Sequence, residues 1–304
     1  MKVTRRMSVL VALATTVPVA AMGAALAPAG ATVARSTAAQ PTTPTLVDVR
    51  AGHHPGYDRV VFEFRGGLPE HQVRYVPQLV GDASGLPVRI AGRAILQARF
   101  SPARAHDNLG APTVSGRTTY ELPNVLTTVQ SGDFEAVTTY GIGLAKRTRV
   151  HVFTLRHPAR VVVDVRAAFR TVNRRVWYFD QSAFVANRRP FFTPRFRPVR
   201  ADRPAVGRLD RLFAGVLPRE HAAGLRLLRS EATGFRLLGI GDGVARVQLT
   251  GGCNSGGSTV SVAGELMPTL RTMVDVSWVK IYDPQGTTER PTGHNDSVPT
   301  CLEP

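Results

Sequence analysis

The sequence predicts two small domains behind an export leader: an N-terminal all-β antiparallel sandwich and a C-terminal α+β domain with one disulfide. Apolar residues alternate with polar ones in short runs between Leu46 and Ala168, which is typical of strands. Helical spacing of apolar residues first appears after Thr171. The two cysteines of the chain, Cys253 and Cys301, both lie in this second part. A hydrophobic content of 43% is sufficient for packed cores.

The N-terminal segment has the layout of a secretory signal peptide. Residues 1–6 carry only positive charge, and the run from Val9 to Ala27 is almost wholly apolar. Small residues follow, and we place cleavage near Ala34, so that residues 1–34 form the signal peptide. The alternative is an uncleaved anchor, which needs about 20 unbroken apolar residues, whereas Pro18 interrupts this run. We therefore expect a secreted, wall-associated protein without a transmembrane anchor after cleavage.

The chain is strongly basic, with a formal charge of +16. Loss of the three basic residues of the leader, Lys2, Arg5 and Arg6, would leave +13 on the exported chain. This charge attracts polyanions, and outside the membrane these are cell-wall polymers or anionic lipid head groups rather than nucleic acid. Nearly all the basic residues are arginine, which GC-rich coding bias explains equally well.

The first predicted domain spans residues 46–168 and follows a solvated linker at 35–45. Its clearest strands are Arg59–Phe64 and Arg160–Val165, each of which places three apolar side chains on one face. Shorter strands are predicted at Val73–Leu79, Ile95–Phe100, Phe134–Tyr140 and Arg149–Leu155. No long amphipathic helix is required, and this pattern predicts an antiparallel β-sandwich.

Three segments of this domain resemble the AMIN domain, and more closely its actinobacterial AMIN-like relatives: Gly56 to Glu63, Tyr140 to Leu144 and His157 to Val165. The resemblance covers about 120 residues. It implies a β-sandwich of envelope proteins that localises its owner, often by binding peptidoglycan. The motifs mostly describe strands, so they say more about the fold than about the ligand.

The second predicted domain, residues 171–284, mixes strands and helices. A strand at Val176–Asp180 precedes a helix whose apolar stripe is stopped by Pro218. Gly239–Gly243 then forms a hairpin turn between two strands. A second helix has its apolar stripe at Val262, Leu266, Leu270 and Met273 and is kinked or divided by Pro268, and a strand at Val276–Tyr282 follows.

The order of these pieces resembles the GerMN domain of spore-formation and actinobacterial envelope proteins. The residues that carry the resemblance are Val176–Phe179, Pro198–Arg200, Leu209–Gly215, Asp242–Leu249 and Pro268–Leu270. The chain departs from the family at Gln248, where an acid is usual, and in the segments around the two cysteines. The resemblance implies an α+β domain and leaves the detailed function open.

The cysteine pair predicts a disulfide between Cys253 and Cys301, because an isolated pair in an oxidising compartment usually forms one. It would tie the C-terminal tail, residues 285–304, to the second domain and stabilise the fold by about 4 kcal/mol. A catalytic or metal-binding cysteine is the alternative.

No group of residues has the spacing of a catalytic or metal site. His53-His54 are strand neighbours that would point to opposite faces, and a surface turn is the better interpretation. The pairs His106-Asp107 and His294-Asn295-Asp296 lie in polar loops, and Ser255 lacks the hydrolase elbow. Gly239–Gly243 leads into a strand and not into a helix N-terminus. We expect a non-enzymatic protein with no metal and no cofactor.

The most suggestive binding feature is a run of arginines interleaved with aromatic residues between Arg174 and Arg203. Arginine and aromatic side chains together can hold anionic or sugar-containing polymers. The alternative is that the aromatics form a core and the arginines a solvated face, and for the aromatics this is the better interpretation. The candidate residues are Arg174, Arg175, Arg188, Arg189, Arg195, Arg197 and Arg200.

Three functions follow from these features in decreasing order. The first is a non-enzymatic envelope module that binds peptidoglycan or another anionic wall polymer, with an envelope protein as a possible partner. The second is a cell-wall hydrolase with an unrecognised site, and the third, disfavoured by export, is a nucleic-acid-binding protein. A concave, arginine-lined surface shared by the two predicted domains would be the most informative observation.

Overall fold

The computed structural model describes residues 42–304, which form one compact unit. The predicted signal peptide, 1–34, and most of the predicted linker, 35–45, lie outside the described residues. No helix within the described part of the chain is long and apolar enough to cross a membrane.

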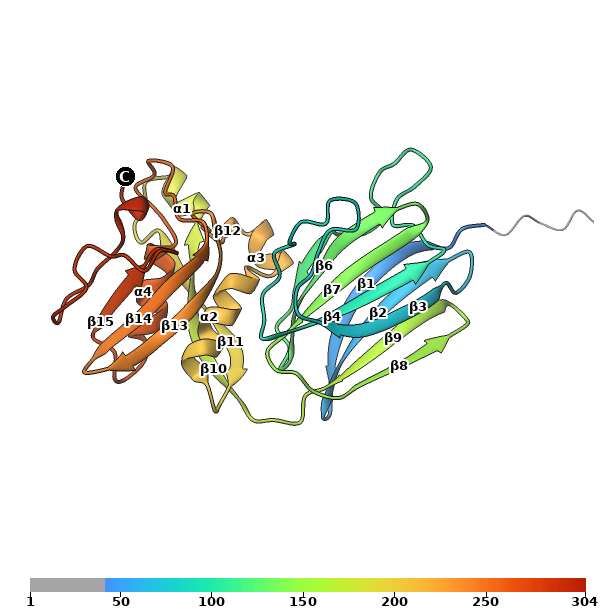
Figure 1. The fold of residues 1–304 in the computed structure, drawn as a ribbon, viewed down its shortest axis with the longest axis horizontal. Helices are drawn as coiled ribbons and strands as arrows, with labels where there is room; N and C mark the ends of the chain where they lie inside the picture. The colour runs from blue at the N-terminus through green and yellow to red at the C-terminus, as the bar shows by residue number, and fades with distance from the viewer. Residues whose placement is uncertain (1–41) are drawn as a thin grey trace, which may run out of the picture. The chain divides into compact units, whose positions relative to one another are not determined.

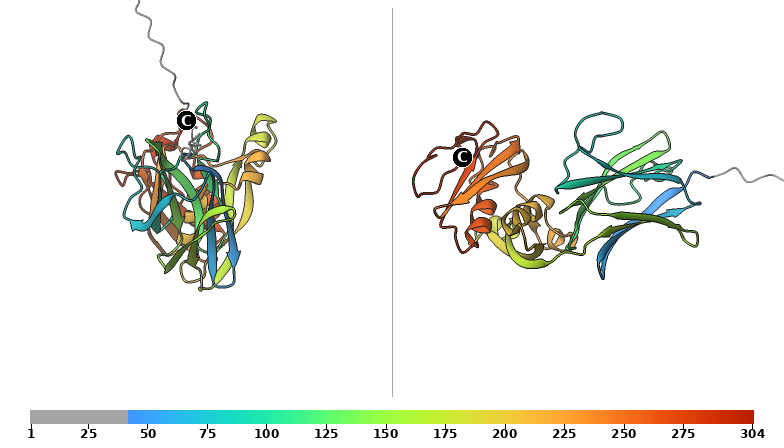
Figure 2. Two further views of the ribbon diagram at one scale, coloured as in Figure 1. Left: turned by 90° about the vertical axis from the view of Figure 1, so that its right-hand side faces the viewer. Right: turned by 60° about the horizontal axis from the view of Figure 1, so that its bottom comes forward.

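Residues 45–166 form two antiparallel sheets that share one core (Figures 1 and 2). The first sheet has the order β1-β2-β9-β8, with β1 at Thr45–His54, β2 at Tyr57–Arg65, β9 at Ala159–Arg166 and β8 at Val150–Leu155. The second has the order β3-β4-β7-β6-β5, with β3 at Glu70–Val76, β4 at Ala94–Ser101, β7 at Val137–Leu144, β6 at Val125–Phe134 and β5 at Arg117–Thr119.

The two strands with the clearest sequence pattern, β2 and β9, pair directly with each other, with Val60 opposite Val163. All six predicted inward residues are buried, which confirms the predicted faces: Val60, Phe62, Phe64, Val161, Val163 and Val165. The ring of Phe62 lies 4.9 Å from that of Phe100 in β4 and 5.6 Å from that of Tyr140 in β7. Each such buried side chain contributes about 1.5–3 kcal/mol.

A buried carboxylate connects the first hairpin to the second sheet. Asp58 is fully buried and accepts hydrogen bonds from the backbone N–H groups of Asn124, at 2.6 Å, and Val125, at 2.9 Å. Its other oxygen lies 2.7 Å from Nδ1 of His53. Asp58 is thus a structural group, since a carboxylate can satisfy several backbone donors at once.

Two sequence predictions in this region are wrong. The strand predicted at Phe134–Tyr140 starts too early: Glu135 and Ala136, with φ of 49° and 57°, form the turn after β6, and β7 begins at Val137. A turn with two left-handed residues usually contains Gly or Asn, and neither is present here to indicate it. His53 and His54, expected in a turn, are the last residues of β1.

The C-terminal region begins with a sheet of order β11-β10-β12: β10 at Thr171–Asp180, β11 at Phe192–Arg200 and β12 at Leu225–Arg226. A second sheet of order β13-β14-β15 comprises Ala232–Gly241, Val244–Gly251 and Trp278–Tyr282, with β15 parallel to β14. The helices are α1 at Gln181–Val185, α2 at Pro204–Ala214, α3 at Pro218–Ala222 and α4 at Ala263–Arg271, with a short 3₁₀ helix at Thr300–Leu302. Helices α2 and α4 contact each other and β10 over a second core.

The two predicted helices are present as α2 and α4, and the Gly239–Gly243 hairpin is confirmed, but Pro218 does not end α2 as predicted. Helix α2 ends before Gly215, and Pro218 is the first residue of α3, because proline's missing N–H costs nothing in a first turn. Pro268 lies inside α4 and does not divide it, and the alternative, a kink at Pro268, stays a prediction. The hydroxyl of Tyr178 donates to the carbonyls of Arg211 at 2.8 Å and Gly215 at 3.1 Å, and so satisfies acceptors that the end of α2 leaves open.

The predicted disulfide is confirmed between Cys253 and Cys301, whose Cα atoms lie 5.6 Å apart. The tail is also held by Lys280, which is buried in β15. Its ammonium donates to the carbonyls of Arg290 at 2.5 Å and Thr292 at 3.0 Å, and to the side chain of Asn295 at 2.7 Å. The division into two domains at residue 168 stays a prediction, since residues 42–304 cluster as one unit.

Replacing both cysteines, Cys253→Ala with Cys301→Ala, should lower the free energy of unfolding by about 2–4 kcal/mol, because the disulfide closes a loop across a separation of 48 residues. Denaturant unfolding without reductant measures the change. The native chain with reductant is the control and should lose a similar amount. An unchanged midpoint would mean that the other contacts of the tail, among them those of Lys280 and the backbone hydrogen bonds of Ser297, hold it without the disulfide.

Candidate functional site

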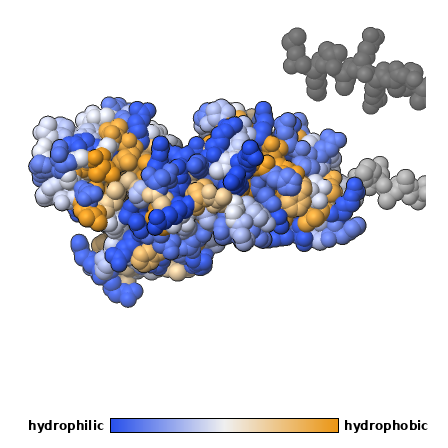
Figure 3. Space-filling model, turned by 90° about the horizontal axis from the view of Figure 1, so that it is seen from below, coloured by the Kyte–Doolittle hydropathy of each residue, from blue (hydrophilic) through white to orange (hydrophobic). Residues whose placement is uncertain are grey.

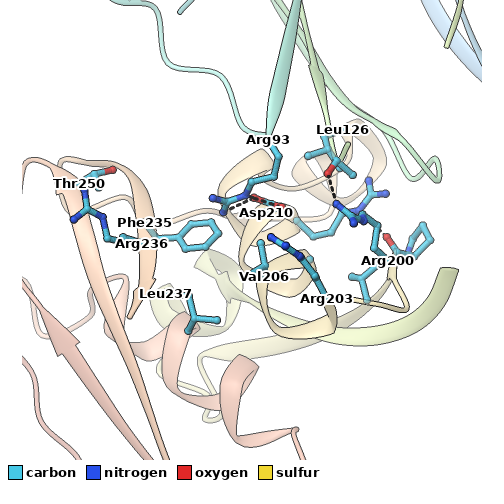
Figure 4. A pocket seen from close by; sticks show the side chains of 15 residues that line it. Arg93, Leu126, Arg200, Arg203, Val206, Asp210, Phe235, Arg236, Leu237 and Thr250 are labelled. Atoms are coloured by element: carbon cyan, nitrogen blue, oxygen red, sulfur yellow. Dashed lines mark hydrogen bonds and ion pairs between the residues drawn. The ribbon is translucent and has the colours of Figure 1, made fainter. Parts of the chain in front are cut away.

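A cavity of about 450 Å³ lies where residues of the two antiparallel sheets meet the C-terminal region (Figure 4). Five arginines line it, and we call it the arginine cleft: Arg93, Arg200, Arg203, Arg211 and Arg236. Leu126 and Ala145 also come from the N-terminal sheets, whereas α2 and β13 supply most of the other walls. The chain therefore has the concave, arginine-lined surface that would favour a binding function.

The cleft arginines are placed by the ends and outward faces of regular elements. Arg93 directly precedes β4 and donates its backbone N–H to the Leu144 carbonyl at 2.7 Å. This approach requires Gly92, where φ is +133° and a Cβ would lie 2.6 Å from that same carbonyl. Arg200 is the last residue of β11, and Arg203 is the N-cap residue of α2.

Arg93 is held by a carboxylate and by an aromatic ring (Figure 4). Its Nε donates to Oδ1 of Asp210 at 2.9 Å, a terminal nitrogen lies 2.8 Å from the same oxygen, and the guanidinium lies 4.4 Å from the ring centre of Phe235. Burial raises the pKa of Asp210 to about 6, against the opposing effect of the arginines, of which Arg93 is the strongest. The Asp210 carboxylate therefore neutralises Arg93 at neutral pH and becomes protonated in mild acid.

Arg211 forms the rigid back of the cleft. It is buried on α2 and donates to the carbonyls of Pro198 at 2.8 Å and Tyr120 at 2.9 Å, and also to that of Leu122. Tyr120 and Leu122 belong to the connection between β5 and β6, so one guanidinium joins the N-terminal sheets to α2 and β11. Burial lowers its pKa to about 10, which leaves it charged at neutral pH.

Two cleft arginines have charges that no acid neutralises. The side chains of Arg203 and Arg236 are exposed and make neither an ion pair nor a hydrogen bond with any residue in 42–304. Arg200, in contrast, pairs with Asp202, its Nε donating to Oδ1 at 3.0 Å. Phe235, Leu237 and Val206 give the cleft an apolar wall between these charges. Forked guanidinium donors beside an apolar wall suit an anionic group carried on a ring or chain.

The structure does not gather the predicted arginines into one surface. Arg200 lies in the cleft, Arg174 and Arg175 line a different pocket, and Arg188 and Arg189 lie in the exposed connection after α1. Arg195 and Arg197 both approach Glu220, an acid that also accepts the backbone N–H of Leu217 at 2.9 Å and so fixes the start of α3. The binding role of the exposed members stays a prediction.

Strand β11 exposes an aromatic side chain and buries an arginine. Phe196 is 57% exposed, whereas Arg197 is 2% exposed and pairs with the buried Glu220. The expectation that the aromatics form the core is therefore wrong at Phe196, and Arg197, for which both interpretations were open, is neither solvated nor free to bind a polymer. Strand alternation assigns neighbours to opposite faces but does not say which face is buried. A partner acid distant in sequence decides it here.

The cleft residues that sequence reasoning missed lie far from the arginine run. Arg93, Asp210 and Arg236 were not among the candidates, and Arg203 was only noted at the end of the run. An acid inside the apolar stripe of α2 is the one local signal, because a buried carboxylate needs a partner.

Another arginine-lined pocket, of about 550 Å³, lies between β5 and the segments around α3. Arg117, Arg226 and Arg229 line it, and no acid does. Burial, and then Arg117 and Arg89, lower the pKa of Arg229 to about 10. Excess positive charge is thus not confined to the cleft.

The candidate catalytic residues have structural partners. Nδ1 of His106 lies 2.6 Å from Asp133, whose carboxylate also accepts from the backbone of Ala105 at 2.8 Å. The carboxylate of Asp107 accepts hydrogen bonds from the backbone N–H groups of Leu109 and Ala111 in its own loop. The hydroxyl of Ser255 donates to the Glu303 carbonyl at 2.6 Å. Among residues 42–304, no three His, Cys, Asp or Glu side chains are grouped to hold a metal.

Comparison with protein families matches residues 44–167 to the AMIN-like domain, and this agrees with the resemblance seen in the sequence. The match spans strands β1 to β9, the two antiparallel sheets. Neither the curated proteins nor the solved structures contain a match to the chain. The resemblance of residues 171–284 to the GerMN domain stays a prediction.

Arg211→Met should lower the free energy of unfolding by about 3–5 kcal/mol, because it leaves the carbonyls of Pro198, Tyr120 and Leu122 without their donor. Urea unfolding measures this change. Arg203→Met on the same helix, where the arginine is exposed, is the matched control and should change stability by less than about 0.5 kcal/mol. Equal losses in the two variants would contradict the role given to Arg211.

Proposed function

We propose that the chain is an exported, non-enzymatic module of the cell envelope that binds an anionic wall polymer in the arginine cleft. The observation that carries the proposal is the charge of the cleft. Asp210 and Asp202 pair with Arg93 and Arg200, and Arg203 and Arg236 face the cavity without a counter-charge. An anionic polymer would supply the missing counter-charge.

The wall as the location of this polymer is supported by the match of residues 44–167 to the AMIN-like domain. AMIN-like domains commonly serve extracytoplasmic proteins as wall-binding modules, and the leader-like residues 1–34 agree with export. Peptidoglycan, which carries peptide carboxylates, and anionic glycopolymers both fit a cleft with guanidinium donors and an apolar wall. The C-terminal region, residues 171–284, is then available to contact an envelope protein.

A wall hydrolase is the alternative, and one pocket gives it a specific basis. His106 and Asp133 line a pocket together with Ser131, whose buried hydroxyl has no hydrogen-bond partner among the described residues. A nucleophile normally bonds to its base, and this serine does not bond to His106. Zymography on embedded peptidoglycan distinguishes the two functions: a clearing band that Ser131→Ala removes would favour the hydrolase.

The double variant Arg203→Gln, Arg236→Gln should reduce the affinity for purified peptidoglycan about tenfold or more, because two charge-assisted contacts are lost. Co-sedimentation over a range of polymer concentrations at moderate salt measures it. The matched control is Arg99→Gln, Arg156→Gln, which removes the same charge from exposed positions that do not line the cleft. If the native chain stays wholly in the supernatant, wall binding is excluded, and equal losses in both variants would indicate non-specific attraction.

Anion binding in the cleft should tighten as the pH falls through about 6. Asp210 becomes neutral below its raised pKa, and the cleft then gains about one unit of positive charge, worth about fivefold in affinity near the surface. Titration with dextran sulfate, whose charge is constant over this range, measures the effect at pH 7.5 and 5. Asp210→Asn should bind at pH 7.5 as tightly as the native chain does at pH 5. An identical pH slope in both proteins would assign the effect to histidines elsewhere.

A further inference from the structure

A buried arginine on α2 has no acid to neutralise it. Arg208 is 4% exposed, and the hydrogen bond of its side chain is to the Pro204 carbonyl at 3.3 Å. Its Nε is buried and has no partner within residues 42–304. Burial and the nearby Arg174 lower its pKa to about 10. An uncompensated buried cation destabilises a fold, so this side chain lacks a structural explanation.

Two more unneutralised arginines stand beside it. Arg174, Arg175 and Arg208 line one pocket of about 440 Å³. Arg174 donates to the carbonyl of its own neighbour, Asn173, at 2.9 Å, and Arg175 lies over the ring of Phe196 at 5.5 Å. Neither forms an ion pair with any described residue.

We propose that this pocket is a second anion site, in which Arg174, Arg175 and Arg208 bind a phosphate-type oxyanion. The orphaned donor of Arg208 and two forked guanidiniums on its rim match the several acceptor oxygens of a tetrahedral oxyanion. Asn173 lines the same pocket, and its side-chain amide can donate to a further oxygen.

The residues on the rim of the pocket indicate which kind of phosphate-containing molecule it would prefer. Phe196 is 57% exposed, and its ring can lie against a sugar or other flat apolar surface. Asp275 is exposed and lines the pocket without an ion pair to the arginines, so it repels an anion at close range. The site is thus expected to bind phosphate weakly by itself and a sugar phosphate more tightly.

This site is independent of the proposed polymer cleft. The arginine cleft is lined by Arg93, Arg200, Arg203, Arg211 and Arg236, none of which lines the pocket of Arg208. Substitutions in one can therefore be measured without altering the other.

The experiment is calorimetric titration of the purified chain with inorganic phosphate and, separately, glucose 1-phosphate, at constant ionic strength set by chloride. Both ligands should bind, the sugar phosphate more tightly. Arg174→Gln should weaken both at least tenfold, and Asp275→Asn should tighten both about threefold. The cleft variant Arg203→Gln, Arg236→Gln is the matched control and should leave both affinities unchanged.

Arg208→Met provides a second readout. It should abolish phosphate binding while the midpoint of denaturant unfolding in phosphate-free buffer stays the same or rises, because the variant removes an uncompensated buried charge. A fall in that midpoint would assign Arg208 a structural role and contradict the proposal. So would an absence of binding by both ligands, or equal affinities in the native chain and Arg174→Gln, whatever the result with peptidoglycan.

Discussion

The guanidinium of Arg211 is the contact on which the arrangement of the candidate site depends. It lies on α2 and donates to carbonyls of the β5–β6 connection and of β11, segments that are distant in sequence. Arginine can do this because its planar fork presents several donors in fixed directions. The adjacent Asp210 then faces Arg93 across the same contact, and Thr119 adds a hydrogen bond to the Ala214 carbonyl at 2.8 Å. The cleft exists because these groups set α2 against the sheets.

The arginines of this chain have different functions that their number does not reveal. Arg197 and Arg211 are buried and neutralised or hydrogen-bonded within the fold. Arg203 and Arg236 face a cavity without a counter-charge. Arg208 is buried like the first pair and lacks a neutralising acid like the second. Arg203, Arg236 and Arg208 can attract an anion strongly, because no carboxylate neutralises their charge. In a paired guanidinium the charge is neutralised and some of the N–H donors are already occupied.

Much of the N-terminal region could be predicted from its sequence. In β2 and β9 apolar residues recur at every second position on the buried face, and a sheet with one buried face requires that period. The turn at Glu135 and Ala136 could not be found, because its left-handed conformation is imposed by the pairing of β6 with β7 and not by its residue types. The exposure of Phe196 and the burial of Arg197 have a similar cause, since Glu220 lies more than 20 positions away.

The sequence by itself determined the strands and helices with strong apolar periodicity, the excess positive charge and the pairing of the two cysteines. These properties depend on local spacing or on composition, and the disulfide had a single possible pairing. Only the tertiary structure decided which arginines are neutralised, which acid lies in the cleft, and that Arg93 meets Asp210 across 117 positions of sequence. The physical reason is that burial and Coulomb interactions depend on distance in space, whereas periodicity describes distance along the chain.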